Sequence, residues 1–135
     1  MLETVSLVIP TQRRLSGLSV AARSVFAQQD PARLELVVVD NDQVPSAQAT
    51  VESLAAEAPF PVVYVHEPKA GVANARNAAL AQAKGELIAF LDDDEEAPPN
   101  WLAGLLSTRT SLDADVVFGP VRGRAPPEIT RHRTY

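Results

Sequence analysis

The stretch LELVVVDND, residues 34–42, carries the strongest signal for the fold. Its first six residues are apolar apart from Glu35 and rich in valine, and three polar residues follow without a break. A continuous apolar run, rather than an alternating one, is typical of a strand buried on both faces of a parallel sheet. The stretch therefore predicts an internal strand whose carboxyl end carries polar side chains.

Similar apolar runs recur along the chain at a steady spacing, with segments of helical periodicity between them. We predict five strands, at Val5–Ile9, Leu34–Val39, Val62–Val65, Leu87–Leu91 and Val116–Phe118. Four apolar stripes of helical spacing begin at Leu15, Val51, Val72 and Trp101. Strands that alternate with helices indicate an α/β domain with a mostly parallel sheet and helices on both faces.

The amino-acid composition excludes several classes of protein. The chain has 135 residues, of which 46% are hydrophobic and 21% charged, and this suits one folded domain. It has no cysteine, which excludes disulfides and thiolate chemistry, and its net charge of −5 argues against nucleic acid as the main partner. Because neither a transmembrane segment nor a signal peptide is evident, we expect a domain in the cytoplasm or at the cytoplasmic face of a membrane.

Polar side chains follow four of the expected strands. Open α/β sheets bind ligands at the carboxyl ends of their strands, where the strand order reverses. The first strand is followed by Pro10 and Thr11, the second by Asp40 and Asn41, and the third by a loop that ends at Gly71. The fourth is followed by five consecutive acids, residues 92–96. We expect these loops to meet at one edge of the sheet and to form a binding site there.

The acidic run Asp92-Asp93-Asp94-Glu95-Glu96 is the most informative of these loops. Adjacent carboxylates repel one another, and burial at a strand end disfavours their charged form unless a cation is present. A hard divalent ion such as Mg²⁺ or Mn²⁺ takes one or two carboxylates together with phosphate oxygens. The alternative is a solvated acidic turn that favours the dipole of the next helix. We favour a metal because the run directly follows an expected buried strand.

Two other positions have both a functional and a structural interpretation. Asp40 and Asn41 could contact a nucleotide base or ribose hydroxyls, or they could close the loop before a helix at Ala47 through an Asx-turn. Arg76 lies beside the apolar stripe of the third helix and near its N-terminus, where a cation suits phosphate. It could equally extend along the surface and pair with an acid.

Four segments in this order and spacing resemble the family-2 inverting glycosyltransferases of the GT-A fold. The segments are VSLVIPTQRR (5–14), VVVDNDQ (37–43), ARNAAL (75–80) and FLDDDEEAPPNWL (90–102), and the resemblance covers roughly residues 4–121. It implies a Rossmann-like nucleotide-binding sheet in which the first and fourth strands are neighbours. It also implies metal-dependent binding of a nucleotide-diphosphate sugar for inverting transfer to an acceptor hydroxyl.

The resemblance also implies roles for individual residues. The base would lie beside Pro10 and Thr11 and be read by Asp40 and Asn41, and Arg76 would lie near the nucleotide. Asp92-x-Asp94 matches the metal-binding Asp-x-Asp motif, with Asp94 as the main ligand of Mn²⁺ or Mg²⁺ and Asp93 turned towards the ribose. The nucleotide-binding set is therefore Pro10, Thr11, Asp40, Asn41, Arg76, Asp92 and Asp93, and the metal set is Asp94 and Asp92.

This chain departs from the family pattern in ways that bear on base selectivity and on catalysis. Gln12 and Arg13 stand where an aromatic residue and asparagine are common, and Asp42-Gln43 stands where Gly-Ser is frequent. No segment matches the catalytic base or the acceptor site, so we expect both to lie beyond Tyr135. We therefore expect residues 1–121 to form the nucleotide-diphospho-sugar-binding domain, and residues 122–135 a polar tail or a linker to a missing acceptor-binding part.

The predicted function is that of the donor-binding part of a hexosyltransferase-like enzyme. Its acceptor would be a saccharide or a lipid-linked saccharide. The alternative is a catalytically inactive nucleotide-binding or regulatory module. A phosphotransfer receiver domain also clusters acids around Mg²⁺, but it carries its paired acids after the first strand, whereas here they follow the fourth.

Overall fold

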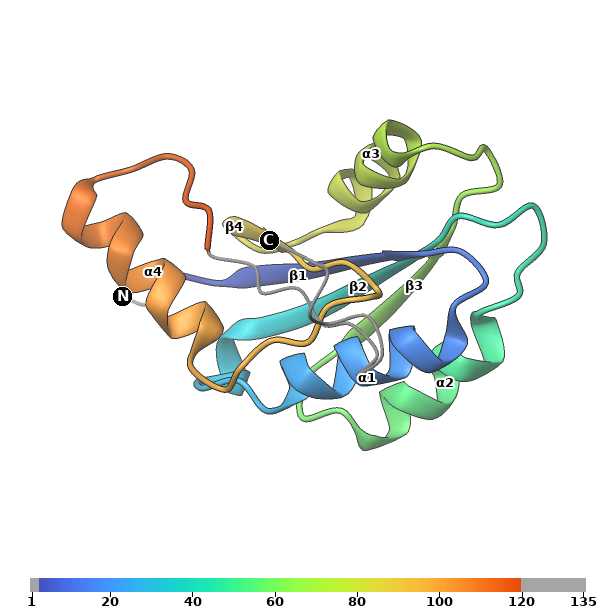
Figure 1. Ribbon diagram of the computed structural model, residues 1–135, viewed down its shortest axis with the longest axis horizontal. Coiled ribbons are helices and arrows are strands. Elements are labelled where there is room, and N and C mark those ends of the chain that lie inside the picture. The colour runs from blue at the N-terminus through green and yellow to red at the C-terminus, as the bar shows by residue number, and fades with distance from the viewer. Residues whose placement is uncertain (1–2, 120–135) are drawn as a thin grey trace, which may run out of the picture. The chain divides into compact units, whose positions relative to one another are not determined.

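Four parallel strands form a single sheet in the computed structural model, which describes residues 3–119 (Figure 1). The strands are β1 (Val5–Thr11), β2 (Leu34–Asp40), β3 (Val62–His66) and β4 (Leu87–Phe90). The helices are α1 (Leu15–Phe26), α2 (Gln48–Glu57), α3 (Val72–Gln82) and α4 (Trp101–Leu112), with a short 3₁₀ turn η1 at Pro31–Arg33. The predicted α/β class is confirmed.

The strand order is β3-β2-β1-β4, and every neighbouring pair is parallel. The first and fourth strands are therefore neighbours, as the family resemblance implies. The chain moves from β1 outward through β2 to β3 and then returns to place β4 on the other side of β1. This reversal puts the carboxyl ends of β1 and β4 next to each other, at the position where α/β sheets bind ligands.

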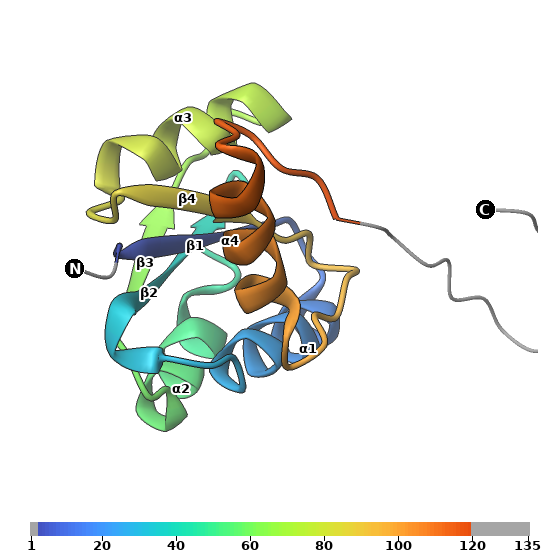
Figure 2. The same cartoon turned by 90° about the vertical axis from the view of Figure 1, so that its left-hand side faces the viewer.

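Helices cover both faces of the sheet, as Figures 1 and 2 show for α3 on one face and for α1 and α2 on the other. The α3 side buries Val8, Val37 and Val39 against Ala75 and Ala79. Alanine favours helix formation and its small side chain lets α3 lie close to the sheet. On the opposite face α1 contributes four fully buried residues, which are Leu18, Ala21, Ala22 and Val25.

Burial differs between the central and the outer strands. The apolar residues of β1 and β2 are buried along nearly their whole length, as the continuous runs predict. The residues of β3 and β4 are mostly half-buried, because each of these strands has one neighbour in the described sheet.

The predicted fifth strand at Val116–Phe118 is wrong. These residues are irregular in the structure, and the side chains of Val116 and Phe118 are 68% and 91% exposed. A run of three apolar residues forms a strand only if a neighbouring strand completes its hydrogen bonds, and within residues 3–119 the sheet has four strands.

The chain divides into two compact units between Ala103 and Gly104, and the sheet belongs to the first. The described part of the second unit holds the remainder of α4 and the irregular segment up to residue 119. The predicted domain end at 121 and the predicted tail at 122–135 lie outside the described residues. None of the helices described has the length and apolar character needed to cross a membrane.

Candidate functional site

The strand ends meet at one edge of the sheet. Thr11, the last residue of β1, is paired with Asp40, the last residue of β2, and Asp40 is paired in turn with His66 of β3. The hydroxyl of Thr11 donates a hydrogen bond of 2.9 Å to Oδ2 of Asp93, in the loop after β4. The bond is buried and joins residues 82 positions apart in the sequence. Side chains from the ends of β1, β2 and β3 and from the loop after β4 therefore lie along one edge.

The carboxylates of the acidic loop differ in their exposure to solvent. Asp93 is buried, whereas Asp92 and Asp94 on either side of it are exposed. The Asp92 amide donates to Oε1 of Glu95 at 2.8 Å, and the Glu95 amide donates to the Asp92 carbonyl at 3.1 Å, so the loop is a tight turn. The turn directs one carboxylate into the protein and leaves two pointing away from its interior.

Arg14 lies next to this loop, although it is not among the site residues predicted from the sequence. Its Nη1 is 3.6 Å from Oδ1 of Asp93 and 3.8 Å from Oδ2 of Asp94. Gly17, one turn further along α1, packs so close to Asp93 that a Cβ atom there would collide with the Asp93 carbonyl oxygen. The only hint in the sequence is the pair of arginines that follows Gln12 after the first strand.

Asp40 is fully buried and has a structural role. Its Oδ2 accepts hydrogen bonds from the Ala47 amide at 2.8 Å and from the Tyr64 hydroxyl at 2.7 Å. Burial, and then the hydrogen bond to Asp40, raise the pKa of the Tyr64 phenol well above its ordinary value. Asp40 therefore closes the loop before α2, as the structural alternative has it, but through a bond that spans seven residues rather than through an Asx-turn. Its other oxygen, Oδ1, is buried and has no hydrogen-bond partner.

Asn41 organises the loop between β3 and α3. Its Nδ2 donates to the carbonyls of Glu67 and Lys69, both at 2.9 Å, and its Oδ1 accepts from the Gly71 amide at 3.0 Å. Gly71 has a φ of 134°, which favours glycine at this position. The three bonds hold the segment from which α3 starts, so Asn41 links the end of β2 to the position of α3.

Asp42 is the third buried acid, and in the sequence it stands only as a departure from the family pattern. Its Oδ2 accepts from Nε of Arg13 at 2.9 Å and from the Ser46 hydroxyl at 2.7 Å, and its Oδ1 accepts from the Gln43 amide at 2.8 Å. The hydrogen bond from Arg13, followed by that from Ser46, lowers the pKa of Asp42 to about 2. Asp42 is therefore ionised and fully engaged in holding the loop before α2.

Arg76 projects from α3 onto the ring of Phe90, the last residue of β4. Its Cζ lies 5.3 Å from the ring centroid, which is the geometry of a cation–π contact. The contact places the guanidinium at the end of β4, immediately before the segment Leu91-Asp92. Pro10, the remaining predicted residue, is half-buried in β1 one position before Thr11.

The donor set suits a divalent ion that is shared with a ligand. Among residues 3–119, no group of three His, Cys, Asp or Glu side chains is arranged to hold a metal. Asp92 and Asp94 offer two exposed carboxylates, and Mg²⁺ is usually held by one or two carboxylates together with substrate phosphates. These two carboxylates could supply the protein's share of the ligands, and a metal there would need further ligands from another molecule.

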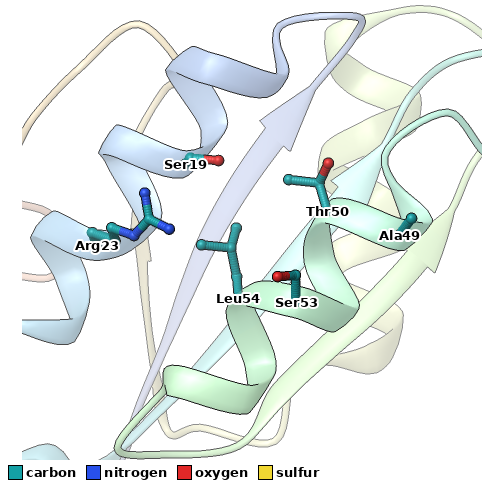
Figure 3. A pocket seen from close by; sticks show the side chains of 6 residues that line it. All are labelled: Ser19, Arg23, Ala49, Thr50, Ser53 and Leu54. Atoms are coloured by element: carbon teal, nitrogen blue, oxygen red, sulfur yellow. The ribbon is translucent and has the colours of Figure 1, made fainter.

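A groove of about 280 Å³ lies elsewhere, between α1 and α2 (Figure 3). It is open, and its lining comes from the two helices and includes none of the strand-end residues. The loops at the carboxyl edge, rather than this groove, carry the convergent acids, so we take them as the candidate site. The groove is lined by Ser19, Arg23, Ala49, Thr50, Ser53 and Leu54.

The structure defines a Rossmann-like α/β domain with polar side chains along the carboxyl edge of its sheet, and comparison with known proteins gives the family. Residues 6–135 match the family model described as "Glycosyl transferase family 2", so the chain belongs to the family-2 glycosyltransferases. The succinoglycan biosynthesis protein ExoM of Rhizobium meliloti is 43% identical over 120 residues, and the match covers 87% of this chain and 39% of ExoM. The chain thus spans about two fifths of that relative.

Solved structures agree on the fold. A mannosyltransferase from Pyrobaculum calidifontis, in complex with GDP-Man and Mn²⁺, superposes with a TM-score of 0.74 at 26% identity, over 81% of this chain and 33% of that one. TarS of S. aureus, in complex with UDP-GlcNAc, superposes with a TM-score of 0.69 at 24% identity, over 92% of this chain and 37% of that one. The predicted GT-A type of fold is confirmed.

Proposed function

We propose that this chain is the donor-binding part of a glycosyltransferase and holds a nucleotide-diphosphate sugar at the carboxyl edge of its sheet. The observation that carries the proposal is the buried hydrogen bond from Thr11 to Asp93, because it places Asp92 and Asp94, exposed, beside the end of β1. A relative of similar fold is in complex with GDP-Man and Mn²⁺, which supports the same class of ligand here.

Asp94 and Asp92 would hold the divalent ion, Mn²⁺ or Mg²⁺, together with diphosphate oxygens of the donor. When bound, such an ion stabilises the negative charge that develops on the departing diphosphate. Arg76 adds a second positive charge near the same strand end, which serves electrostatic stabilisation of the leaving group. Transfer would proceed by direct displacement at the anomeric carbon, with inversion.

The β2 end suits recognition of the nucleoside. Asp40 Oδ1 is a buried acceptor without a partner, and such an atom costs about 1–3 kcal/mol unless it gains a hydrogen bond. An N–H of a nucleotide base would satisfy it if the loop opens on binding. Asn41 would act by holding the loop from Glu67 to Gly71, which borders the same end of β2.

The proposal also covers the acceptor and the catalytic base. The acceptor is a saccharide or a lipid-linked saccharide, and its hydroxyl would be deprotonated by a carboxylate beyond Tyr135. We also expect the domain to work in the cytoplasm. Fractionation of cells that express the whole protein tests that location directly.

Thermal unfolding with nucleotides tests the proposal. Melting temperatures are measured with UDP, dTDP or GDP, in Mn²⁺ and in chelator. One nucleotide is expected to stabilise the fold only when Mn²⁺ is present, by about 2.7 kcal/mol at ~100 times its dissociation constant. Asp94→Asn is expected to abolish the metal-dependent part of this stabilisation.

Glu96→Gln is the matched control, because Glu96 is exposed two residues further along the same loop and the charge change is identical. We expect it to retain metal-dependent stabilisation. Equal effects of Asp94→Asn and Glu96→Gln would show that the loop is an acidic turn without a specific metal ligand. Equal stabilisation in Mn²⁺ and in chelator would remove the metal from the proposed site. Stabilisation by no nucleotide at all would contradict donor binding itself.

A further inference from the structure

The two arginines that follow β1 are held in different ways. Arg13 donates from Nε to the buried Asp42 at 2.9 Å, a hydrogen bond of ordinary length. Arg14 is 3.6 Å from Asp93 and 3.8 Å from Asp94, which is within ion-pair range but beyond a good hydrogen bond. Arg13 is therefore fixed to the loop before α2, whereas Arg14 is held by charge alone.

The backbone keeps Arg14 beside the acidic loop. The Arg14 carbonyl accepts the first hydrogen bond of α1, from the Leu18 amide at 2.8 Å. Gly17 packs directly against the Asp93 carbonyl, so the first turn of α1 is held against the loop. A cation at position 14 consequently stays near the acids, while its side chain, 61% exposed, is free to change direction.

The two acids that Arg14 contacts are not equivalent. The Asp93 side chain is 11% exposed, and its other oxygen already accepts from Thr11. The Asp94 side chain is 64% exposed and is reached from Arg14 by a long contact. Exposed pairs of this kind are weak and are screened by salt. Asp94 can therefore exchange its partner, whereas Asp93 stays with Thr11.

We propose that Arg14 is a resident counter-cation of the acidic loop, which neutralises Asp94 in the metal-free protein and releases it when the divalent ion and a nucleotide diphosphate bind. This inference rests on the proposed metal-dependent donor binding. Metal alone must displace Arg14 and therefore binds weakly. A diphosphate supplies negative charge for the released guanidinium, so metal and nucleotide favour each other. Arg14 is a positioning residue that acts through Asp94.

Binding of Mn²⁺ in the absence of nucleotide tests the inference, with free Mn²⁺ quantified by its electron paramagnetic resonance signal. Arg14→Gln is expected to bind Mn²⁺ roughly two- to fivefold more tightly than the unaltered protein at low ionic strength. The difference is expected to shrink at high salt, because the pair is exposed. Arg14→Lys, which keeps the charge, is expected to restore the weaker affinity.

Arg23→Gln is the control: Arg23 lies on α1, the helix that begins directly after its N-cap residue Arg14, and the substitution removes the same charge, but Arg23 pairs with Glu57 of α2. It is expected to leave Mn²⁺ affinity unchanged. With UDP or GDP added, Arg14→Gln is expected to show a smaller gain in Mn²⁺ affinity than the unaltered protein. Circular dichroism confirms that each variant is folded.

The outcomes separate this inference from the proposed function. If the unaltered protein binds Mn²⁺ and nucleotide cooperatively but Arg14→Gln has the same or a weaker affinity for Mn²⁺ alone, the counter-cation role is wrong and donor binding stands. If Arg23→Gln raised the affinity for Mn²⁺ as much as Arg14→Gln does, the effect would come from net charge alone, and the counter-cation role of Arg14 would also be wrong. If the unaltered protein binds no Mn²⁺ even with nucleotide, both proposals fail.

Discussion

Three acids at the carboxyl edge are buried, and each is held by its own set of donors. Asp40 is bonded by Ala47 and Tyr64, and Asp93 by Thr11 with Arg14 nearby. Asp42 accepts from Arg13, Ser46 and its neighbouring amide. A buried carboxylate is tolerated when donors surround it, and each of these acids consequently ties one loop to the end of a strand.

Asp42 is expected to make the stability of the fold depend on pH in the acid range. Its pKa is about 2 in the folded protein and 3.8 as an ordinary side chain, so the unfolded state binds more protons between these values. The stabilising contribution is complete above about pH 5 and is lost as the pH falls towards 2. The free energy of unfolding is measured with urea for the unaltered protein and for Asp42→Asn. The difference between the two is expected to become smaller as the pH falls from about 5 towards 2.

Asp115→Asn is the control for this measurement, because Asp115 is exposed and the substitution removes the same charge. No narrowing is expected for it. If the difference in free energy of unfolding between the unaltered protein and Asp42→Asn stayed constant from pH 7 to pH 2, the hydrogen bonds to Asp42 would stabilise the fold equally whether its carboxyl group is ionised or protonated. The pKa shift would then not contribute to stability.

At the scale of elements, α1 and the acidic loop approach each other through a glycine. The backbone carbonyl of Asp93 occupies the space where a side chain at position 17 would begin. Backbone cannot rotate away as a flexible side chain can, so any larger residue must displace α1 or the loop. This contact is where the packing of a helix determines the position of the candidate site.

Gly17→Ala is expected to destabilise the fold by about 1–3 kcal/mol, the usual cost of overpacking. It is also expected to weaken Mn²⁺-dependent nucleotide binding, because the Asp93 backbone must shift. Urea unfolding and the thermal assay measure the two effects. Gly104→Ala, in α4, is the control: a Cβ there meets no atom within 4 Å, and the change is expected to stabilise by roughly 0.5–1 kcal/mol. Stabilisation by both substitutions would contradict the close approach at Gly17.

At the scale of the whole molecule, this chain corresponds to part of its relatives. It covers 39% of ExoM and 33% of the mannosyltransferase from Pyrobaculum calidifontis. The described sheet supplies acids, a threonine and arginines around one edge, which suits binding of a charged donor. Glycosyl transfer also needs an oriented acceptor and a base, and orientation alone supplies about 7–11 kcal/mol of a barrier.

We therefore predict that residues 1–135 bind a nucleotide sugar but transfer no sugar to an acceptor. Slow Mn²⁺-dependent hydrolysis of the nucleotide sugar by water, to nucleoside diphosphate and free sugar, is expected, since the metal and Arg76 can stabilise that leaving group. The assay quantifies both released diphosphate and glycosylated product, with the full-length protein as the positive control. Efficient glycosylation by residues 1–135 would contradict the prediction and place a base inside this chain. Glu67 and Glu96, in loops at the edge of the site, would then be the first residues to substitute.

The sequence by itself determined the type of fold and the edge of the sheet at which the polar side chains gather. Uninterrupted valine-rich runs indicate buried parallel strands, and helical spacing between them indicates crossovers, because burial and periodicity are local properties of a chain. The position of the acidic run directly after a strand placed it at the carboxyl edge. The same reasoning failed at Val116–Phe118, where an apolar run has no neighbouring strand within the described residues to complete its hydrogen bonds.

Only the tertiary structure decided what each polar side chain does. Five adjacent carboxylates look alike in the sequence, yet Asp93 is buried because Thr11, 82 residues away, donates to it. Arg14 lies near Asp93 and Asp94, whereas Arg13 donates to Asp42. The bonds from Arg13 and Ser46 give Asp42 its structural role. These contacts join segments that are distant in the chain, and their partners are set by strand order and helix packing rather than by local pattern.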